Sequence, residues 1–280
     1  MRGEIPALTP DPNPSSALEF ILQVEDLYAA LVRPESAIAN GEPSLGGKLL
    51  YTGELSAYGR ALLVAGNIAG AASLAATADV TAQKQAIRDG VADFLVTSLD
   101  EALRILKNEI RKRETVAVCI AASPDAVERE MLERGVVPDL LPSLGSPVSP
   151  TTIFGQGARR IELSDDESGR DLVAWSVAAA PSHWLPRLDA LALDCFCRDS
   201  TPEALAARRW LRLAPRYLGR LAQGLRLLRC QPDATKEFVS RAQSAVDRGE
   251  FGVEVRISVN KDTEVFLFQP SEATNAEGEG

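Results

Sequence analysis

Histidine is nearly absent from this chain of 280 residues, which contains only one, His183. Because histidine is the side chain whose ordinary pKa lies nearest to neutral pH, any mechanism built on a histidine base must use His183 or another kind of residue. His183 opens a predicted helix, and no partner nucleophile is evident in the sequence. Histidine-based catalysis is therefore not a chemistry that this sequence favours.

Cysteine is also scarce, and its four positions show no paired framework of the kind that small secreted proteins use. Cys195, Cys197 and Cys230, together with His183, could supply four metal ligands. Cys-x-Cys is not the usual zinc spacing, however, and leucines surround these positions, so we interpret them as buried structural cysteines and predict no metal. The absence of a disulfide framework suits a reducing compartment, and we expect a cytoplasmic protein.

Long apolar runs are missing as well. No segment approaches the length needed to cross a bilayer, and the first sixteen residues, MRGEIPALTPDPNPSS, lack the apolar centre of a secretion signal. The net charge of −9 argues against a dedicated nucleic-acid binder. We therefore expect neither a membrane span nor a nucleic-acid partner, whereas a homo-oligomer remains open.

Short apolar runs alternate with helical segments between residues 44 and 150. The helical segments carry recognisable ends, such as the capping pair Ser98 and Glu101 and the glycines Gly90 and Gly135. This alternation is typical of right-handed crossovers in a parallel sheet. The predicted fold class is α/β, with a Rossmann-like parallel sheet and flanking helices. Its strands are expected at residues 49–52, 73–77, 93–97, 116–122 and 139–142.

The pattern changes after Pro150 and predicts a C-terminal α+β subdomain at 151–270. Two hairpins are expected in it, and Pro215 is expected to break a helix. The hairpins pair 159–163 with 170–178 and 252–259 with 263–269, and the helices span 184–195, 202–213, 215–229 and 234–249. The rest of the chain is divided into a flexible arm (1–15), a helix with a linker (16–43) and a disordered tail (271–280).

The turn after the first predicted strand, TGELSAYGR (52–60), is the first place to look for a ligand, because parallel sheets bind ligands at the carboxyl ends of their strands. A dinucleotide fingerprint needs closely spaced glycines, and this turn has only Gly53 and Gly59. Glu54 would repel a phosphate at the helix N-terminus, and Arg60 could offset that repulsion or pair with Glu54. From these residues alone we interpret the segment as a packed strand-to-helix turn.

The order of residues from Ser44 to Leu141 nevertheless resembles the NAD-binding Rossmann domain of the urocanases (urocanate hydratases). The likeness is clearest in ERGVVPDLL (133–141), which is similar to the family pattern R-G-V-x-P-D-x-V, and Asp93 falls where the family carries Tyr-Val-Asp. Further matching stretches are SLGGKLLYTGEL (44–55), AGNIAGAASL (65–74) and SLDEAL (98–103). The resemblance implies a Rossmann-like fold. It makes NAD a candidate, but the sequence itself does not identify a cofactor.

The positions that carry function in urocanases differ in this chain. The family's glycine-rich turn, approximately G-L-G-G-M-G-G-A-Q-P, is replaced by ELSAYGRALL (54–63), and the acid that would hold the adenosine ribose falls at Thr77, two residues before Asp79. The family's Gly-Asn pair becomes Ala122 and Ser123, and its segment beside the active site becomes PSLGSPVSP (142–150). The resemblance therefore places the candidate cofactor-binding residues at Gly53, Gly59, Thr77, Asp79, Ser123 and Ser143.

Urocanases are about twice this length, and their substrate-binding motifs have no counterpart in residues 1–43 or 151–280. We therefore expect a divergent, truncated relative without hydratase activity and assign no catalytic residue. A nucleotide or small anion at the strand ends is the predicted ligand. The enzyme alternative is an active NAD-dependent hydratase or lyase acting on urocanate or a related substrate.

A third alternative is an interaction or assembly protein, because residues 203–229 carry seven arginines and one acid. Arg208, Arg212, Arg216 and Arg220 recur every four residues beside a leucine-rich face, a pattern that can dock an acidic partner. We favour the interpretation that these arginines form a solvated face paired with the protein's own acids.

Overall fold

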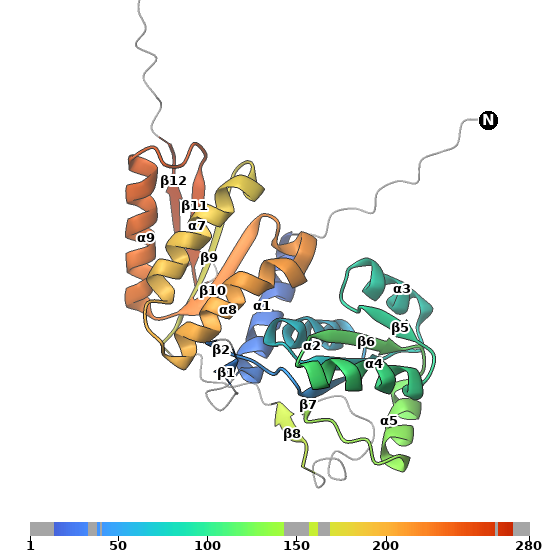
Figure 1. The fold of residues 1–280 in the computed structure, drawn as a ribbon. Helices are drawn as coiled ribbons and strands as arrows, with labels where there is room; N and C mark the ends of the chain where they lie inside the picture. Colours follow the sequence, from blue (N-terminus) through green and yellow to red (C-terminus); the bar gives the residue numbers. More distant parts are fainter. Residues whose placement is uncertain are drawn as a thin grey trace, which may run out of the picture.

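A computed structural model describes residues 14–32, 38–39, 41–142, 157–161, 169–260 and 263–270. This part of the chain forms a six-stranded parallel sheet, a four-stranded antiparallel sheet and a short ribbon of β1 (Ile38–Ala39) and β2 (Glu42–Pro43), with helices around them (Figure 1). The α/β fold class is confirmed. The predicted tail 271–280, most of the predicted arm and the candidate residue Ser143 lie outside the described residues.

The parallel sheet has the strand order β5-β6-β4-β3-β7-β8. Every residue of its central strands β4 and β6 is buried, as expected for a parallel sheet covered on both faces. All five strands predicted from the apolar runs are present, and a sixth joins them. The strands are β3 (Leu49–Glu54), β4 (Ala72–Ala76), β5 (Phe94–Val96), β6 (Val116–Ile120), β7 (Leu140–Pro142) and β8 (Arg159–Ile161).

Helices cover both faces of this sheet. On one face lie α2 (Ala57–Ala69) and α3 (Val80–Arg88), and on the other lie α4 (Leu99–Lys112) and α5 (Pro124–Glu133). The predicted cap of α4 is confirmed, because the Ser98 hydroxyl accepts a hydrogen bond from the Glu101 N–H. The Glu101 carboxylate completes the cap by accepting from the Thr97 N–H.

The antiparallel sheet has the order β10-β9-β11-β12, and α7 (Pro181–Phe196) and α9 (Pro232–Asp247) pack on one of its faces. Trp175 lies at the centre of that packing, with ring centroids 5.2 Å from Phe238 and 6.3 Å from Phe196. The predicted hairpin of β11 and β12 is confirmed. The strands are β9 (Asp171–Val177), β10 (Leu225–Cys230), β11 (Val255–Val259) and β12 (Glu264–Phe268).

The other predicted hairpin, 159–163 with 170–178, is wrong. β8 pairs in parallel with β7, whereas β9 pairs with β10 and β11 in the other sheet. Two strand patterns next to each other in the sequence favour a hairpin, but the choice of partner depends on the whole sheet.

The predicted helix break at Pro215 is also wrong. Helix α8 (Pro202–Leu218) continues through Pro215, a short 3-10 turn follows, and residues 225–230 form strand β10 instead of a helix. A proline removes one backbone donor, and here the buried residues Leu211, Ala214 and Leu218 hold the last turn of the helix in the core. The run LRLLRC has no clear period, so its strand conformation was not evident from its pattern.

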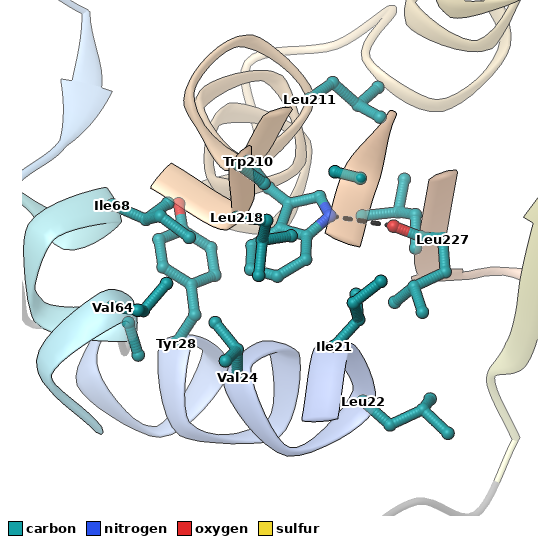
Figure 2. Close-up of a cluster of buried hydrophobic side chains, with 14 of the residues drawn as sticks. Ile21, Leu22, Val24, Tyr28, Val64, Ile68, Trp210, Leu211, Leu218 and Leu227 are labelled. Carbon is teal, nitrogen blue, oxygen red and sulfur yellow. Dashed lines mark hydrogen bonds between the residues drawn. The ribbon is translucent and has the colours of Figure 1, made fainter. Parts of the chain in front are cut away.

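Helix α1 (Pro14–Leu31) lies in the core between the two sheets, packed against α2, α8 and β10 (Figure 2). The ring centroids of Tyr28 and Trp210 are 5.3 Å apart, and the Trp210 indole N–H donates to the Leu227 carbonyl over 2.7 Å. The surrounding apolar side chains are Ile21, Leu22, Val24, Val64, Ile68, Leu211 and Leu218. One apolar cluster therefore joins the two halves of the protein, while the predicted domain boundaries themselves stay predictions.

A buried ion pair fastens α1 to β10. The Arg229 guanidinium donates to the Glu25 carboxylate over 2.9 Å and also reaches Asp26 over 2.5 Å. Burial is the main reason why the pKa of Glu25 rises from its ordinary value of 4.5 to about 7, and Arg229 only partly opposes this rise. Glu25 is therefore expected to change its protonation near neutral pH.

The free energy of unfolding is expected to depend on pH through Glu25. Because its pKa is higher in the folded protein than in the unfolded chain, protonation favours folding, so this contribution is complete below about pH 4.5 and is lost as the pH rises through about 7. Glu25→Gln should remove the effect. The free energy of unfolding of Glu25→Gln relative to the native protein should thus rise by on the order of 1–3 kcal/mol between about pH 5 and pH 8, measured by urea titration. A difference that stays constant or falls with pH would contradict this assignment.

Candidate functional site

The carboxyl edge of the parallel sheet brings several of the predicted site residues together. Gly53, Thr77 and Ser123 lie at or just after the ends of β3, β4 and β6, which are neighbours in the sheet. The chain leaves β4 and β6 towards helices on opposite faces, and this is the place where open α/β sheets bind ligands. The site predicted from the sequence therefore coincides with the expected ligand position of the fold.

The backbone structure explains why both positions of the turn, 53 and 59, are glycine. Gly53 has a φ of +74°, and the register between β3 and β4 shifts between Tyr51 and Gly53, so the strand needs a residue without a side chain there. At Gly59 a Cβ atom would lie 1.9 Å from the Glu54 carbonyl oxygen. Gly59 thus allows α2 to pack closely on the end of β3, which explains its presence without any bound phosphate.

The N-terminus of α2, where a dinucleotide would place its pyrophosphate, is capped by the chain itself. The Ser56 hydroxyl accepts from the Gly59 N–H over 3.3 Å, and the Ser56 carbonyl accepts from the Arg60 N–H. The Arg60 guanidinium forms an ion pair with Asp89 at 2.6 Å. The sequence had suggested that Arg60 either offsets or pairs with Glu54, and the structure directs it to the end of α3 instead.

Thr77 and Asp79 are engaged in the turn between β4 and α3. The Thr77 side chain is buried and accepts from the Asp79 N–H over 3.2 Å, and its carbonyl accepts from the Gln83 side chain. The Asp79 carboxylate accepts from the Thr81 N–H over 2.7 Å and caps α3. Both side chains therefore stabilise the turn in which a ribose-binding acid would be expected.

Ser123 precedes α5, and its exposed side chain forms no capping hydrogen bond. Its carbonyl accepts from the N–H groups of Ala126 and Val127. Among the predicted site residues that the structure describes, Ser123 is thus the one whose hydroxyl is most available to a ligand.

The charge at this edge is acidic. The exposed side chains Glu54, Asp79 and Asp125 follow or flank the strand ends. Burial raises the pKa of the Cys119 thiol to about 11, and the charge of Glu54 adds to this effect. A field of this sign opposes the binding of phosphate groups.

A buried carboxylate that the sequence did not reveal lies beneath the sheet. Glu128 of α5 is fully buried and accepts a hydrogen bond from the Tyr51 hydroxyl over 3.0 Å. Burial and then Glu128 raise the pKa of Tyr51 above its usual range, so this hydroxyl stays protonated and donates. A glutamate in an amphipathic helix is typical of an exposed position, and therefore no sequence signal pointed to this pair.

Strand order and the helices on both faces define a Rossmann-like α/β domain. Domains of this class bind their ligands at the carboxyl edge of the sheet. Residues 28–153 match the family model of the urocanase Rossmann-like domain. This part of the chain is therefore similar to the urocanase Rossmann-like domain. In the described part of the chain, no helix is both long and apolar enough to span a bilayer.

Two of the residues that carry the family resemblance, Asp93 and Asp139, support the scaffold at the opposite, amino edge of the sheet. Asp139 accepts from the Leu49 N–H over 2.8 Å and forms an ion pair with Lys48 at 2.9 Å. Asp93 likewise accepts a hydrogen bond from the Ala117 N–H over 2.8 Å. Gly135 has a φ of +64° and follows the end of α5. These contacts join neighbouring strands and do not reach the edge where a ligand would bind.

NAD does not fit the residues of the turn in the usual way. The helix N-terminus already holds the Ser56 hydroxyl, the residue at the ribose position is the buried Thr77, and exposed Glu54 adds negative charge where the pyrophosphate would lie.

The remaining candidates from the sequence lie elsewhere. His183 is exposed in the first turn of α7, with its ring 4.7 Å from that of Trp184. The four cysteines are buried, and burial raises the pKa of both Cys197 and Cys230. No group of three or more potential metal ligands occurs among the residues that the structure describes.

Most of the arginine-rich segment is engaged within the protein. Arg212 forms an ion pair with Glu42, Arg226 with Asp189 and Arg229 with Glu25. Arg208 and Arg209 instead donate to the backbone carbonyls of Cys197 and Ile68. The predicted pairing with the protein's own acids is confirmed for Arg212, Arg226 and Arg229, but Arg226 and Arg229 are largely buried and do not form the predicted solvated face.

Proposed function

We propose that this protein retains the urocanase Rossmann-like scaffold, lacks urocanate hydratase activity and acts as a binding or assembly protein. The observation that carries the proposal is the state of the turn after β3. Gly59 serves helix packing, Ser56 caps α2, and Arg60 pairs with Asp89. The residues that would hold NAD in a urocanase are thus replaced or used for structure.

A ligand at the carboxyl edge stays a prediction. A nucleotide or small anion there would use the Ser123 hydroxyl and the N-terminus of α5, and would have to overcome the acidic charge of Glu54 and Asp79. A thermal-shift series with NAD, NADH, ATP and inorganic phosphate tests it, since a ligand that binds the folded state raises the melting temperature.

Docking of an acidic partner on the arginine-rich helix is the less favoured candidate. Arg208, Arg209 and Arg212 already hold backbone or carboxylate oxygens of the same chain. An acidic partner would have to compete with these contacts. The arginine-rich segment is better explained as a device that joins the two halves of the protein.

The purified protein is expected to contain no NAD and to leave urocanate unchanged. The measurement is NAD content after acid extraction, together with the ultraviolet absorbance of urocanate on prolonged incubation with and without added NAD. A functional urocanase, assayed in parallel, controls for the integrity of the reagents. Stoichiometric NAD, or a loss of absorbance proportional to protein concentration, would overturn the proposal and favour an active hydratase.

A further inference from the structure

Among the described residues, strand β12 is the outermost strand of the antiparallel sheet (Figure 1). It presents apolar side chains to solvent. Val265 and Leu267 are 41% and 56% exposed. They point to the same face of the sheet, away from α9, because alternate residues of a strand share a face. An edge strand of this kind, without lysine or proline among its residues 264–268, offers a template for another strand.

The sequence of β12 is complementary to itself in an antiparallel pairing. If two copies align with Phe266 opposite Phe266, then Val265 lies opposite Leu267 of the other copy and Glu264 lies opposite Phe268. All five residues of the strand are paired, and no like charges face each other. Displacing the register by two residues in either direction leaves Val265 or Leu267 without this apolar partner.

We infer that two copies of this chain associate through β12, so that their antiparallel sheets join across a two-fold axis. The four exposed side chains, Val265 and Leu267 from each copy, then form a continuous apolar patch. On β11, Arg256 lies opposite Leu267 and Ser258 opposite Val265. These polar residues border the patch on both sides, an arrangement typical of protein interfaces with an apolar centre and a polar rim.

The face of the sheet towards α9 is open beside β12. A groove of about 620 Å³ runs between α9 and β12, and its apolar lining includes Val239, Phe266 and Phe268. The rings of Phe266 and Phe268 stack with centroids 6.3 Å apart. The partner's Phe266 and Phe268 would extend this row of rings, and α9 would shield them from solvent.

The edge of the parallel sheet is the competing surface. Phe94 and Leu95 of β5 are 47% and 41% exposed. β5 contains three residues, however, so self-pairing centred on Leu95 joins only three residue pairs, and it would add an antiparallel strand to a parallel sheet. The longer strand, its complementary register and the groove favour β12. Phe94 and Leu95 therefore serve as a matched control.

Light scattering of the full-length protein across a concentration series is expected to show a monomer–dimer equilibrium. Val265→Lys/Leu267→Lys should raise the dissociation constant by about tenfold or more, because the register places the new ammonium groups of one copy opposite those of the other. The control Phe94→Lys/Leu95→Lys should dimerise like the native protein. A native protein that stays monomeric at every concentration would overturn the inference. It would also be overturned if the control variant were monomeric while the Val265→Lys/Leu267→Lys variant still dimerised.

Cross-linking tests the register itself. A mixture of Val265→Cys and Leu267→Cys proteins should form disulfide-linked dimers under mild oxidation, because these positions lie opposite each other, whereas each variant alone should form far fewer. The four native cysteines are buried. Oxidation of the unmodified protein therefore measures the background of cross-linking that does not involve β12. Equal cross-linking in the mixture and in the separate samples would contradict the proposed register.

Discussion

Replacing Arg209 with methionine is expected to lower the free energy of unfolding by about 3–5 kcal/mol. Arg209 is only 9% exposed, and its Nε donates to the Ile68 carbonyl over 2.6 Å at the C-terminus of α2. Burial lowers the pKa of its guanidinium, which marks the cost of placing this charge in the core. Methionine fills a similar volume but leaves the Ile68 carbonyl without this donor and buried Glu42 with one cation fewer.

The effect follows from where Arg209 lies. Gly70 ends α2 with a φ of +90°, and a Cβ atom there would lie 2.6 Å from the Arg209 guanidinium. The helix of the parallel-sheet half is thus closed by an arginine from α8 of the other half. Removing Arg209 should therefore loosen the contact between the two halves as well as the end of α2.

Arg212→Met is the matched control, because Arg212 also pairs with Glu42 but its side chain is 56% exposed. Its loss is expected to cost about 1 kcal/mol or less, since the Arg212 side chain is more than half exposed and Arg209 remains beside Glu42. Urea-induced unfolding followed by tryptophan fluorescence gives both values. Equal losses in the two variants would show that the Ile68 contact contributes nothing of its own.

Gly59→Ala is expected to destabilise the protein by about 2 kcal/mol or more. Alanine favours a helix over glycine by about 1 kcal/mol, so helix propensity alone predicts stabilisation. The new Cβ, however, would lie 1.9 Å from the Glu54 carbonyl oxygen, a backbone atom that cannot move without displacing β3 or α2. The steric overlap is therefore expected to outweigh the gain in propensity.

Gly224→Ala is the control for this substitution, because no atom of the described residues lies within 4 Å of the Cβ position there and no positive φ is needed. Its free energy of unfolding should change by about 0.5 kcal/mol or less. The pair also separates two explanations of Gly59. If Gly59 were needed only for the approach of a phosphate, then Gly59→Ala would leave the stability of the ligand-free protein unchanged, and the packing explanation would be wrong.

Local signals in the sequence were reliable where the physics is local. Ser98 caps α4 because its side-chain oxygen reaches an N–H three residues away, and this depends on few other residues. The strands of the parallel sheet were equally evident, since their apolar runs lie between well-marked helices. The ligand edge followed from that alternation, because the carboxyl ends of parallel strands must lie together.

The errors arose where distant residues compete for the same segment. The pattern of residues 159–161 indicates a strand but does not say that β7, and not β9, is its partner. Pro215 is a helix breaker by its own chemistry, yet the burial of Leu211 and Leu218 carries α8 past it. The roles of Arg60 and Glu128 were equally hidden, because their partners Asp89 and Tyr51 lie 29 and 77 residues away in the chain.

The order of residues was enough to predict five strands of the parallel sheet, the cap of α4 and the likeness to the urocanase Rossmann-like domain, because short-range periodicity and spacing carry that information. The use of the turn after β3 became evident only in the folded protein. The number of glycines could not show that Gly59 lies against the Glu54 carbonyl or that Arg60 turns to Asp89. Both facts depend on the packing of α2 against β3 and α3, and that packing follows from burying the apolar faces of all these elements at once.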